Sequence, residues 1–266
     1  MRRNGLAALL FSTLFVVFMI APLVVVIGVS FTSTGYLEFP PSEPGLRWFR
    51  AILTNPDFID AALLSLELGV TSATIATVLA VPAALAIGRE KFPGRDVLQS
   101  LFLSPLMVPT VVLGVGFLRF LTLISMNGTL IGLALCHAVV IFPFILRLSL
   151  AAIVGLDQSV EKAAVSLGAS SLTVFRRITL PLIMPGVCGG WILAFITSFD
   201  ELTVSIFIIN PSTTTLPVKL FNHITQTTDP LVTSVSTAMI LFTVCIMLFV
   251  NWLYGLDRLL IGEGSR

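Results

Sequence analysis

Residues 161–187 read EKAAVSLGASSLTVFRRITLPLIMPGV and form a polar island between two long apolar segments. The whole chain is 56% hydrophobic and 11% charged, with a mean hydropathy of +1.02. A charge at the centre of a membrane helix costs about 3 kcal/mol on insertion scales, and this stretch carries Glu161, Lys162, Arg176 and Arg177. The sequence therefore predicts a loop outside the hydrocarbon, between two membrane spans.

The first half of this loop has the signals of a short helix. Asp157 or Ser159 can cap its amino end, and Gly168 can end it. At helical spacing one face is apolar and consists of Val160, Ala163, Ala164 and Leu167. The loop is therefore expected to carry an amphipathic helix.

A second short helix is expected from Ser170, which can cap it, to about Arg177. Pro181 and Pro185 come next, and proline removes a backbone donor and clashes with the preceding turn. Regular helix is therefore predicted to stop before the next apolar run begins.

The chain is predicted to be an all-α, polytopic membrane protein with a single domain over residues 1–266. About 20 apolar residues cross the hydrocarbon core of a bilayer. Six segments are long enough, near residues 6–31, 61–87, 97–121, 129–150, 183–209 and 230–254. Prolines inside these spans, including Pro105 and Pro109, are expected to kink or open helices beside protein or a water-filled cavity, or to serve packing alone.

The basic residues predict the orientation of the spans. Of the 15 Lys and Arg residues, 11 fall on one side of this layout, three on the other, and Arg119 lies near a span end. Because the basic side is cytoplasmic, both termini and the 157–182 loop are expected in the cytoplasm of a bacterial cell, with the spans in its inner membrane. Trp48 and Phe49 beside arginines predict a short helix at the outer surface, and residues 210–229 a polar outer loop.

The loop resembles the cytoplasmic EAA loop of ABC importer permeases. Lys162 departs from that pattern at a position expected to face solvent. The matching residues are Glu161, Ala164, Gly168, Ala169, Phe175, Ile178, Leu180, Pro181, Pro185 and Gly186.

The resemblance implies that the loop docks on an ATPase subunit and couples it to the membrane helices. The residues expected to carry this coupling are Glu161, Ala164, Gly168, Ala169, Phe175, Arg176, Leu180 and Pro181. It also implies a second, homologous permease subunit forming a heterodimer, two ATPase subunits and an extracytoplasmic solute-binding protein. A plain amphipathic surface helix between two spans is the other interpretation of the loop.

Two adjacent acids, Asp200 and Glu201, fall inside the predicted fifth span, where charges are costly and commonly functional. On a continuous helix, Glu201 shares a small, polar face with Thr197, Ser198 and Ser205, whereas Asp200 faces apolar residues. Glu201 is therefore the favoured residue for lining a solute path, with Asp200, Thr197 and Ser198 beside it. A brace between helices, through Arg119 or Lys219, is the structural alternative.

Span five and the residues after it are similar to permeases of the spermidine/putrescine importers. The similarity rests on residues 198–202 (SFDEL), 214–217 (TTLP), 229–230 (DP) and 236–237 (ST). It implies a polyamine, and an acidic pair suits a desolvated ammonium group. Related permeases handle aminophosphonates, opines and amino-acid derivatives, so transport of one of these small solutes is the alternative.

Composition excludes several other functions. A net charge of +1 provides no basic surface for nucleic acid. The three cysteines lack metal or disulfide spacing, and no cofactor, metal site or catalytic group is predicted. The chain has no phosphate-binding GxxxxGK run, so it is not expected to be an enzyme, and a partner must hydrolyse ATP. Two other classes fit less well than a subunit of an ATP-driven importer. An ion-coupled secondary carrier leaves the ordered loop unexplained, and an intramembrane enzyme is not supported by the isolated His137.

Overall fold

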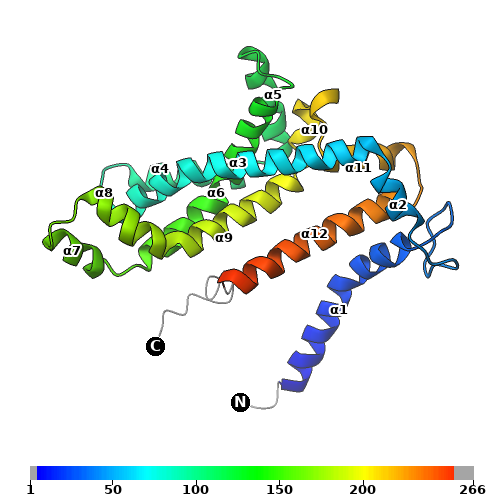
Figure 1. Cartoon of the computed structure of the whole chain (residues 1–266), viewed down its shortest axis with the longest axis horizontal. Helices are drawn as coiled ribbons and strands as arrows, with labels where there is room; N and C mark the ends of the chain where they lie inside the picture. Colours follow the sequence, from blue (N-terminus) through cyan, green and yellow to red (C-terminus); the bar gives the residue numbers. More distant parts are fainter. Residues whose placement is uncertain (1–4, 255–266) are drawn as a thin grey trace. The chain divides into compact units, whose positions relative to one another are not determined.

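The computed structural model describes residues 5–254, which are helical through most of their length (Figure 1). The α-helices are α1 Gly5–Ser30, α2 Arg47–Leu53, α3 Pro56–Arg89, α4 Arg95–Leu103, α5 Thr110–Leu123, α6 Leu130–Val154, α7 Ser159–Ser166, α8 Ser171–Val174, α9 Leu180–Phe199, α10 Ser205–Ile208, α11 Leu216–Gln226 and α12 Leu231–Tyr254. Two 3₁₀ turns, η1 Ser104–Leu106 and η3 Pro211–Thr213, and a π-helical turn, η2 Phe175–Thr179, complete the set. The all-α class is confirmed.

Five described helices are long and apolar enough to cross a membrane, and a sixth span results if α4 to α5 are counted together. This agrees with the predicted multi-span layout. The basic residues Arg2, Arg3, Arg258 and Arg266 and the predicted positions of both termini lie outside the described residues.

The third predicted span, 97–121, is not one straight helix. Its two halves, Arg95–Leu106 and Thr110–Leu123, meet at an angle of 99°. The break falls between Pro105, in the η1 turn, and Pro109, whose extended backbone precedes α5. Two prolines four residues apart remove two helical donors, so the chain turns here instead of kinking gently.

The described chain divides into two compact units. One contains Met1–Asp60 and Lys219–Cys245, and the other contains Ala61–Val218 and Ile246–Arg266. In the first unit, Ser234 Oγ donates to the Ser30 carbonyl at 3.1 Å, and Lys219 pairs with Asp57 at 2.6 Å. The short helix predicted near Trp48 is present as α2, and the Trp48 indole N–H donates to the Thr34 carbonyl.

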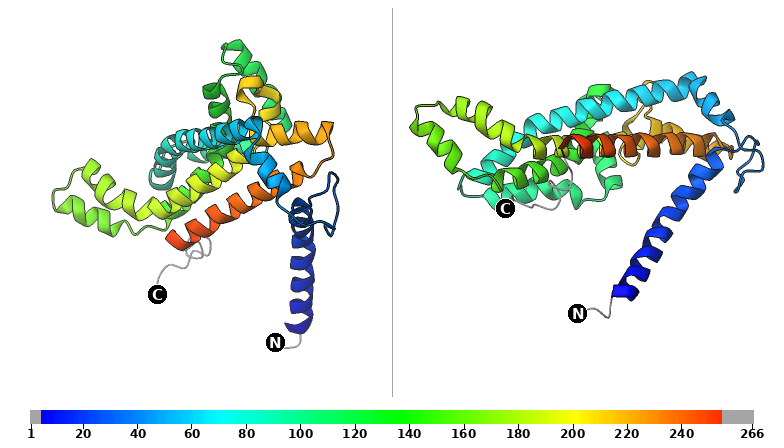
Figure 2. Two further views of the ribbon diagram at one scale, coloured as in Figure 1. Left: turned by 45° about the vertical axis from the view of Figure 1, so that its right-hand side comes forward. Right: turned by 60° about the horizontal axis from the view of Figure 1, so that its bottom comes forward.

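The second unit is built around α6 and α9, which lie side by side in both views (Figure 2). Their close approach depends on two glycines of α9. A Cβ on Gly186 would lie 2.9 Å from the Leu148 carbonyl oxygen, and one on Gly190 would lie 3.0 Å from Ile145 Cα. Small residues let helix backbones touch, so α6 and α9 pack as one rigid pair. A buried apolar cluster that includes Leu68, Leu121, Leu133 and Val204 adds α3, α5 and α10 to this core.

The prolines of the loop do not stop the helix, contrary to the prediction. Residues Ser171–Phe199 run without a break from α8 through η2 into α9, with Pro181 in the first turn of α9 and Pro185 inside it. The π turn moves the register, and the Leu180 N–H donates to the Phe175 carbonyl five residues back. Such a local change accommodates proline in a membrane helix. Span five therefore begins within the loop.

At its other end, span five is shorter than predicted. The α9 helix ends at Phe199, and residues 200–204 are not helical, so the 183–209 helix was wrong beyond this point. The helical face that was predicted to join Glu201, Thr197 and Ser205 does not exist. The segment predicted as a polar outer loop, residues 210–229, contains the amphipathic helix α11.

Candidate functional site

The loop between α6 and α9 folds as a pair of short helices, α7 and α8, at the amino-terminal end of α9 (Figure 1). Helix α7 has an unusual distribution of side chains. Of its two charged residues, Glu161 is buried, whereas apolar residues on and next to the helix are exposed: Val160 by 48%, Val165 by 56% and Leu167 by 89%. Exposed apolar side chains gathered on one short element are typical of a surface that a partner covers.

The turn between α7 and α8 has a defined geometry. Gly168 has φ +87°, and its N–H donates to the Val165 carbonyl, while the N–H of Ala169 donates to Ala164. These two bonds form a Schellman motif, which requires a left-handed residue at this position. Ser170 then caps α8, accepting from the Thr173 N–H at 3.3 Å. The predicted stop at Gly168 and cap at Ser170 are confirmed.

The start of α7 differs slightly from the prediction. The residue at the cap position is Gln158, and the Asp157 carboxylate accepts from the N–H and the hydroxyl of Ser159. The Ser159 backbone N–H, the Ser159 hydroxyl and the nearby Lys162 charge hold the pKa of the Asp157 carboxyl below its ordinary value. Asp157 thus orders the entry to the helix from one residue earlier.

The Glu161 carboxylate is the centre of the loop's internal contacts. Its Oε2 lies 2.6 Å from Arg89 Nη1, and its Oε1 accepts from Arg89 Nη2 at 2.7 Å. The Thr179 hydroxyl also donates to Oε1. Sequence patterns predict no pairing for Arg89 or Thr179, because both are distant from Glu161 along the chain. The contacts line an open pocket of about 680 Å³ between the end of α3, α7 and the α8–η2 turns.

The other residues predicted for coupling lie around this centre. Arg176 and Pro181 are exposed, whereas Ala164, Ala169, Phe175 and Leu180 are half-buried. Lys162, which departs from the family pattern, is exposed as predicted. The structure thus places the predicted set on one continuous segment, with Glu161 as its buried member.

A second candidate site lies where two helices are interrupted. An open cavity of about 520 Å³ is lined by the break between α4 and α5, by α6 and by the end of α9. Its polar lining comes mainly from Thr110, Thr197, Asp200, Glu201 and Thr203. Irregular backbone at membrane depth is tolerated only where it is buried in protein or lines a water-filled cavity. The two helix breaks here line an open cavity.

The two acids of this site are placed differently. Glu201 folds back on the chain, where its carboxylate accepts from the backbone N–H of Val204 at 2.8 Å and of Ser205 at 3.0 Å. Its Oε2 also lies 4.0 Å from Nε2 of His137. Asp200, the residue after α9, is exposed to the cavity, and within residues 5–254 its carboxylate has no hydrogen-bond or ion-pair partner. The predicted preference for Glu201 over Asp200 rested on a helix that is absent here.

His137 explains why Ser198 does not line the cavity. The buried imidazole lies 2.8 Å from Ser198 Oγ through Nδ1 and 2.9 Å from Ser205 Oγ through Nε2. It ties α6 to α9 and α10, so it acts as a packed contact between helices. Thr197 does line the cavity, and its hydroxyl donates to the Leu193 carbonyl at 2.8 Å. Neither Arg119 nor Lys219 contacts Glu201 among the described residues; Lys219 pairs with Asp57.

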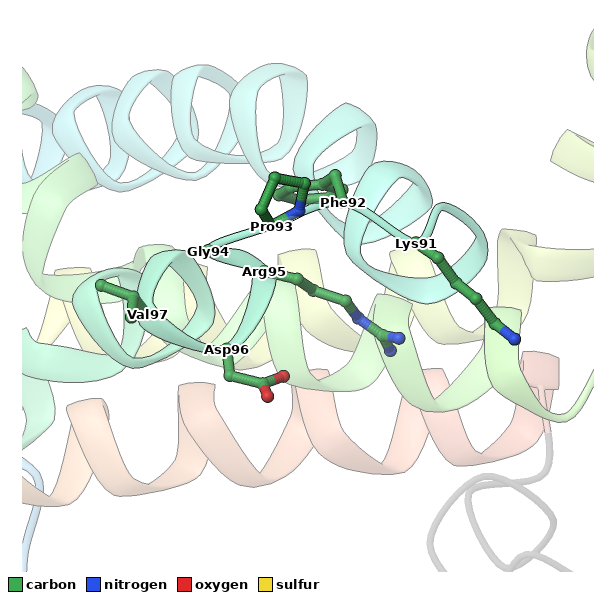
Figure 3. A pocket seen from close by; sticks show the side chains of 7 residues that line it. All are labelled: Lys91, Phe92, Pro93, Gly94, Arg95, Asp96 and Val97. Atoms are coloured by element: carbon green, nitrogen blue, oxygen red, sulfur yellow. The ribbon is translucent and has the colours of Figure 1, made fainter.

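A third, smaller hollow lies over the turn from α3 to α4. It is formed by seven consecutive residues, Lys91 to Val97, and Figure 3 shows the Lys91 and Arg95 side chains extending from the turn. Gly94 has φ +85°, which makes the turn tight. Because one short segment makes the whole hollow, it is a surface feature of the turn. In the part of the chain that the structure describes, no cluster of side chains has the make-up of a metal site.

Comparison with known proteins identifies this architecture. Residues 76–256 match the family described as binding-protein-dependent transport system inner membrane component. The chain is 29% identical over 250 residues to the spermidine/putrescine transport system permease protein PotC of Escherichia coli (strain K12), covering 93% of each. It is 31% identical over 242 residues to the putrescine transport system permease protein PotI of the same strain, covering 88% of this chain and 85% of the relative.

One further relative and one solved structure are also similar to this chain. The chain is 33% identical over 218 residues to the putative 2-aminoethylphosphonate transport system permease protein PhnV of Salmonella paratyphi A, covering 81% of this chain and 82% of the relative. Its fold matches a chain of a bacterial ABC transporter involved in the import of alginate, an acidic polysaccharide. That match has a TM-score of 0.72 at 15% identity and covers 95% of this chain and 96% of the other.

Fold and likenesses together define a permease subunit of an ABC importer. The chain belongs to the family of binding-protein-dependent transport system inner membrane components. The same fold serves a chain from an importer of an acidic polysaccharide, so the fold does not fix the solute.

Proposed function

We propose that this permease subunit imports a small organic cation, a polyamine of the spermidine or putrescine type, and that Asp200 contacts it. The observation that carries the proposal is the cavity at the two helix breaks, into which the Asp200 carboxylate opens without a partner among the described residues. The relatives PotC and PotI, whose names give spermidine and putrescine as solutes, support the same class.

The chemistry of the cavity suits an ammonium group. A cation that leaves water needs a compensating charge, and Asp200 offers one that no side chain of the described residues uses. The hydroxyls of Thr110, Thr197 and Thr203 supply neutral acceptors nearby. A volume of about 520 Å³ lies within the range of sites for small molecules. Because Glu201 is held by backbone N–H groups, its role in the proposal is to shape the wall.

The proposed transport needs partners. The chain has no phosphate-binding run, so ATP hydrolysis is assigned to two ATPase subunits, one of which docks on the exposed apolar side of α7. A second, homologous permease subunit would complete the pathway, and an extracytoplasmic binding protein would deliver the solute. Alternating access would follow from movement of the loop and the helices joined to it.

The proposed topology puts residues 157–182 and both termini in the cytoplasm. It is supported by the unequal distribution of Lys and Arg residues. A reporter enzyme that is active only outside the membrane, fused after Arg266, is expected to be silent, and the same reporter inserted in residues 210–215 to be active. Strong activity of the fusion after Arg266 would overturn the orientation.

A zwitterion is the second candidate solute, because the amino end of α5 lines the same cavity as Asp200. The 14-residue α5 directs the positive end of its dipole there, which favours an anionic group. An aminophosphonate carries an ammonium and a phosphonate on one small molecule. The similarity to PhnV, whose name gives 2-aminoethylphosphonate, supports this candidate.

Uptake by the intact importer, expressed in cells that lack their own polyamine and phosphonate importers, decides between the two solutes. Labelled putrescine, spermidine and 2-aminoethylphosphonate are compared at equal concentration, with and without the permease. The proposal expects uptake of a polyamine that falls about tenfold in Asp200→Asn, since a charge-assisted contact is lost. Asp96→Asn, the same change at an exposed position outside this cavity, is the matched control. Uptake of the phosphonate alone would replace the polyamine with the zwitterion.

A further inference from the structure

The contact between Arg89 and Glu161 joins two segments that lie 72 residues apart in the sequence. Each terminal nitrogen of the guanidinium meets a different carboxylate oxygen, at 2.6 Å and 2.7 Å. This forked geometry is the strongest form of an arginine–carboxylate pair, and it fixes the angle between the two side chains as well as their distance. The side chains are only 22% and 12% exposed, so water screens the pair weakly.

Both partners stand at helix ends where their charges are favourable. Arg89 is the last residue of α3, and Glu161 lies in the first turn of α7. A cation at a carboxyl end and an anion at an amino end each interact well with the helix dipole. The Thr179 hydroxyl brings the η2 turn, which leads directly into α9, to the same carboxylate. Three elements therefore meet at Glu161.

The buried position of Glu161 separates it from the loop surface. The exposed side of the loop includes large apolar residues, above all Leu167 and Leu172, which are 89% and 64% exposed. A carboxylate that is 12% exposed and already holds three donors has little left to offer a partner subunit.

We infer that Arg89 is a positioning residue for coupling: it holds Glu161, and thereby α7, at the angle at which the apolar side of the loop meets the ATPase. The inference rests on the proposed coupling role of the loop. It assigns Glu161 an internal task, in which the acid orients the loop and leaves contact with the ATPase to its neighbours. Movement of α7 is then passed to α3 through Arg89 and to α9 through Thr179.

Lysine cannot replace arginine fully in this arrangement. Its ammonium is a point charge and cannot form the fork, so Arg89→Lys keeps the attraction but loses the fixed angle. Arg89→Ala removes both and leaves Glu161 buried without its charge partner. The series Arg, Lys, Ala therefore separates orientation from attraction. Lys91, exposed in the turn just after α3, offers a matched removal of positive charge.

The test uses the whole importer in liposomes, with labelled putrescine, spermidine or 2-aminoethylphosphonate, whichever of the three the wild-type complex transports. Variants Arg89→Lys, Arg89→Ala, Glu161→Ala and the double alanine variant are compared with Lys91→Ala. Two quantities are measured: the ATPase retained on the purified permease, and the solute imported per ATP hydrolysed. We expect each single alanine variant to lower import per ATP about tenfold, and the double variant to be no worse than either. For Arg89→Lys, we expect import per ATP to lie between the values of the wild type and Arg89→Ala. For Lys91→Ala, we expect it to lie within about twofold of the wild-type value.

Two results would overturn the inference. If Glu161→Ala is impaired while Arg89→Ala transports normally, Glu161 acts on the ATPase directly. If the two losses multiply in the double variant, the residues act independently. If an alanine variant fails to accumulate in the membrane, Arg89→Lys and Arg89→Gln are measured in its place. Normal import per ATP in both of these variants would overturn the inference.

The failure of the proposed coupling role has a different signature. Leu167→Asp alters only the exposed side of the loop. If it retains the ATPase and couples normally, the loop itself is not the docking surface, whatever Arg89 does. The ratio of solute imported to ATP hydrolysed can be measured with any solute that the importer accepts. The test therefore stays valid if the polyamine assignment is wrong.

Discussion

Glu161 and Glu201 are buried to nearly the same depth, with side chains 12% and 9% exposed, but they are satisfied in opposite ways. Glu161 finds its partners far along the chain, in Arg89 and Thr179. Glu201 finds most of its partners three and four residues ahead, in the N–H groups of Val204 and Ser205. One acid holds separate elements together, and the other shapes a local turn. Burial of a carboxylate therefore does not by itself indicate its task.

The comparison is tested most strongly by reversing the charge of Glu161. In Glu161→Lys, the new ammonium lies beside Arg89, and a buried charge is left without its partner. We expect the free energy of unfolding to fall by about 3–5 kcal/mol. Thermal melting of the purified permease in detergent measures this, with Lys162→Glu as the control at the exposed neighbouring position. An equal melting temperature in both variants would show that the ion pair does not brace the loop.

A smaller effect is expected when Glu201 loses its carboxylate. Glu201→Leu leaves the N–H groups of Val204 and Ser205 without their acceptor, which costs about 1–3 kcal/mol. Glu201→Gln keeps one acceptor oxygen, so its loss of stability should be about half as large. The same melting experiment distinguishes the two variants. If Glu201→Gln instead leaves stability unchanged and abolishes uptake, the residue belongs to the solute path.

The turn at Gly168 should contribute less than either acid. Its φ of +87° is unfavourable for a residue with a Cβ, and no atom lies within 4 Å of the position that a Cβ would take, so only backbone strain is at issue. Gly168→Val is expected to cost about 1–2 kcal/mol and to reduce ATPase retention on the purified complex. Gly168→Asn should cost less, because asparagine tolerates this region. Full ATPase retention by the valine variant would argue against a fixed loop shape.

The smallest effect on stability is expected at Asp200. Its carboxylate has no partner among the described residues, so Asp200→Asn should change the free energy of unfolding by less than about 0.5 kcal/mol. Uptake is expected to fall even so. A loss of stability as large as that of Glu201→Leu would mean that Asp200 braces the fold, and it would remove the main support for a cationic solute.

Much of the architecture could be predicted from local signals. Apolar length predicted a chain with several membrane spans, and Gly168 and Ser170 predicted the end of one loop helix and the start of the next. Each of these signals lies within or next to the element that it defines, so it can be recognised without knowledge of long-range contacts. The predicted stop at Pro181 failed because a π turn supplies a register in which the helix continues. The predicted face of Glu201 failed because the span was assumed to be helical as far as residue 209, whereas α9 ends at Phe199.

The sequence by itself determined the class of the protein. Its apolar content and the ordered polar segment 161–187 already require membrane spans separated by a structured loop, because hydrocarbon excludes the loop's charges. Only the tertiary structure decided which acid does what. The pairing of Glu161 with Arg89 depends on the end of α3 meeting α7, and the opening of Asp200 to a cavity depends on two helix breaks meeting at one place. Both features depend on segments that are far apart in the sequence. The residue types and their spacing along the chain therefore do not predict them.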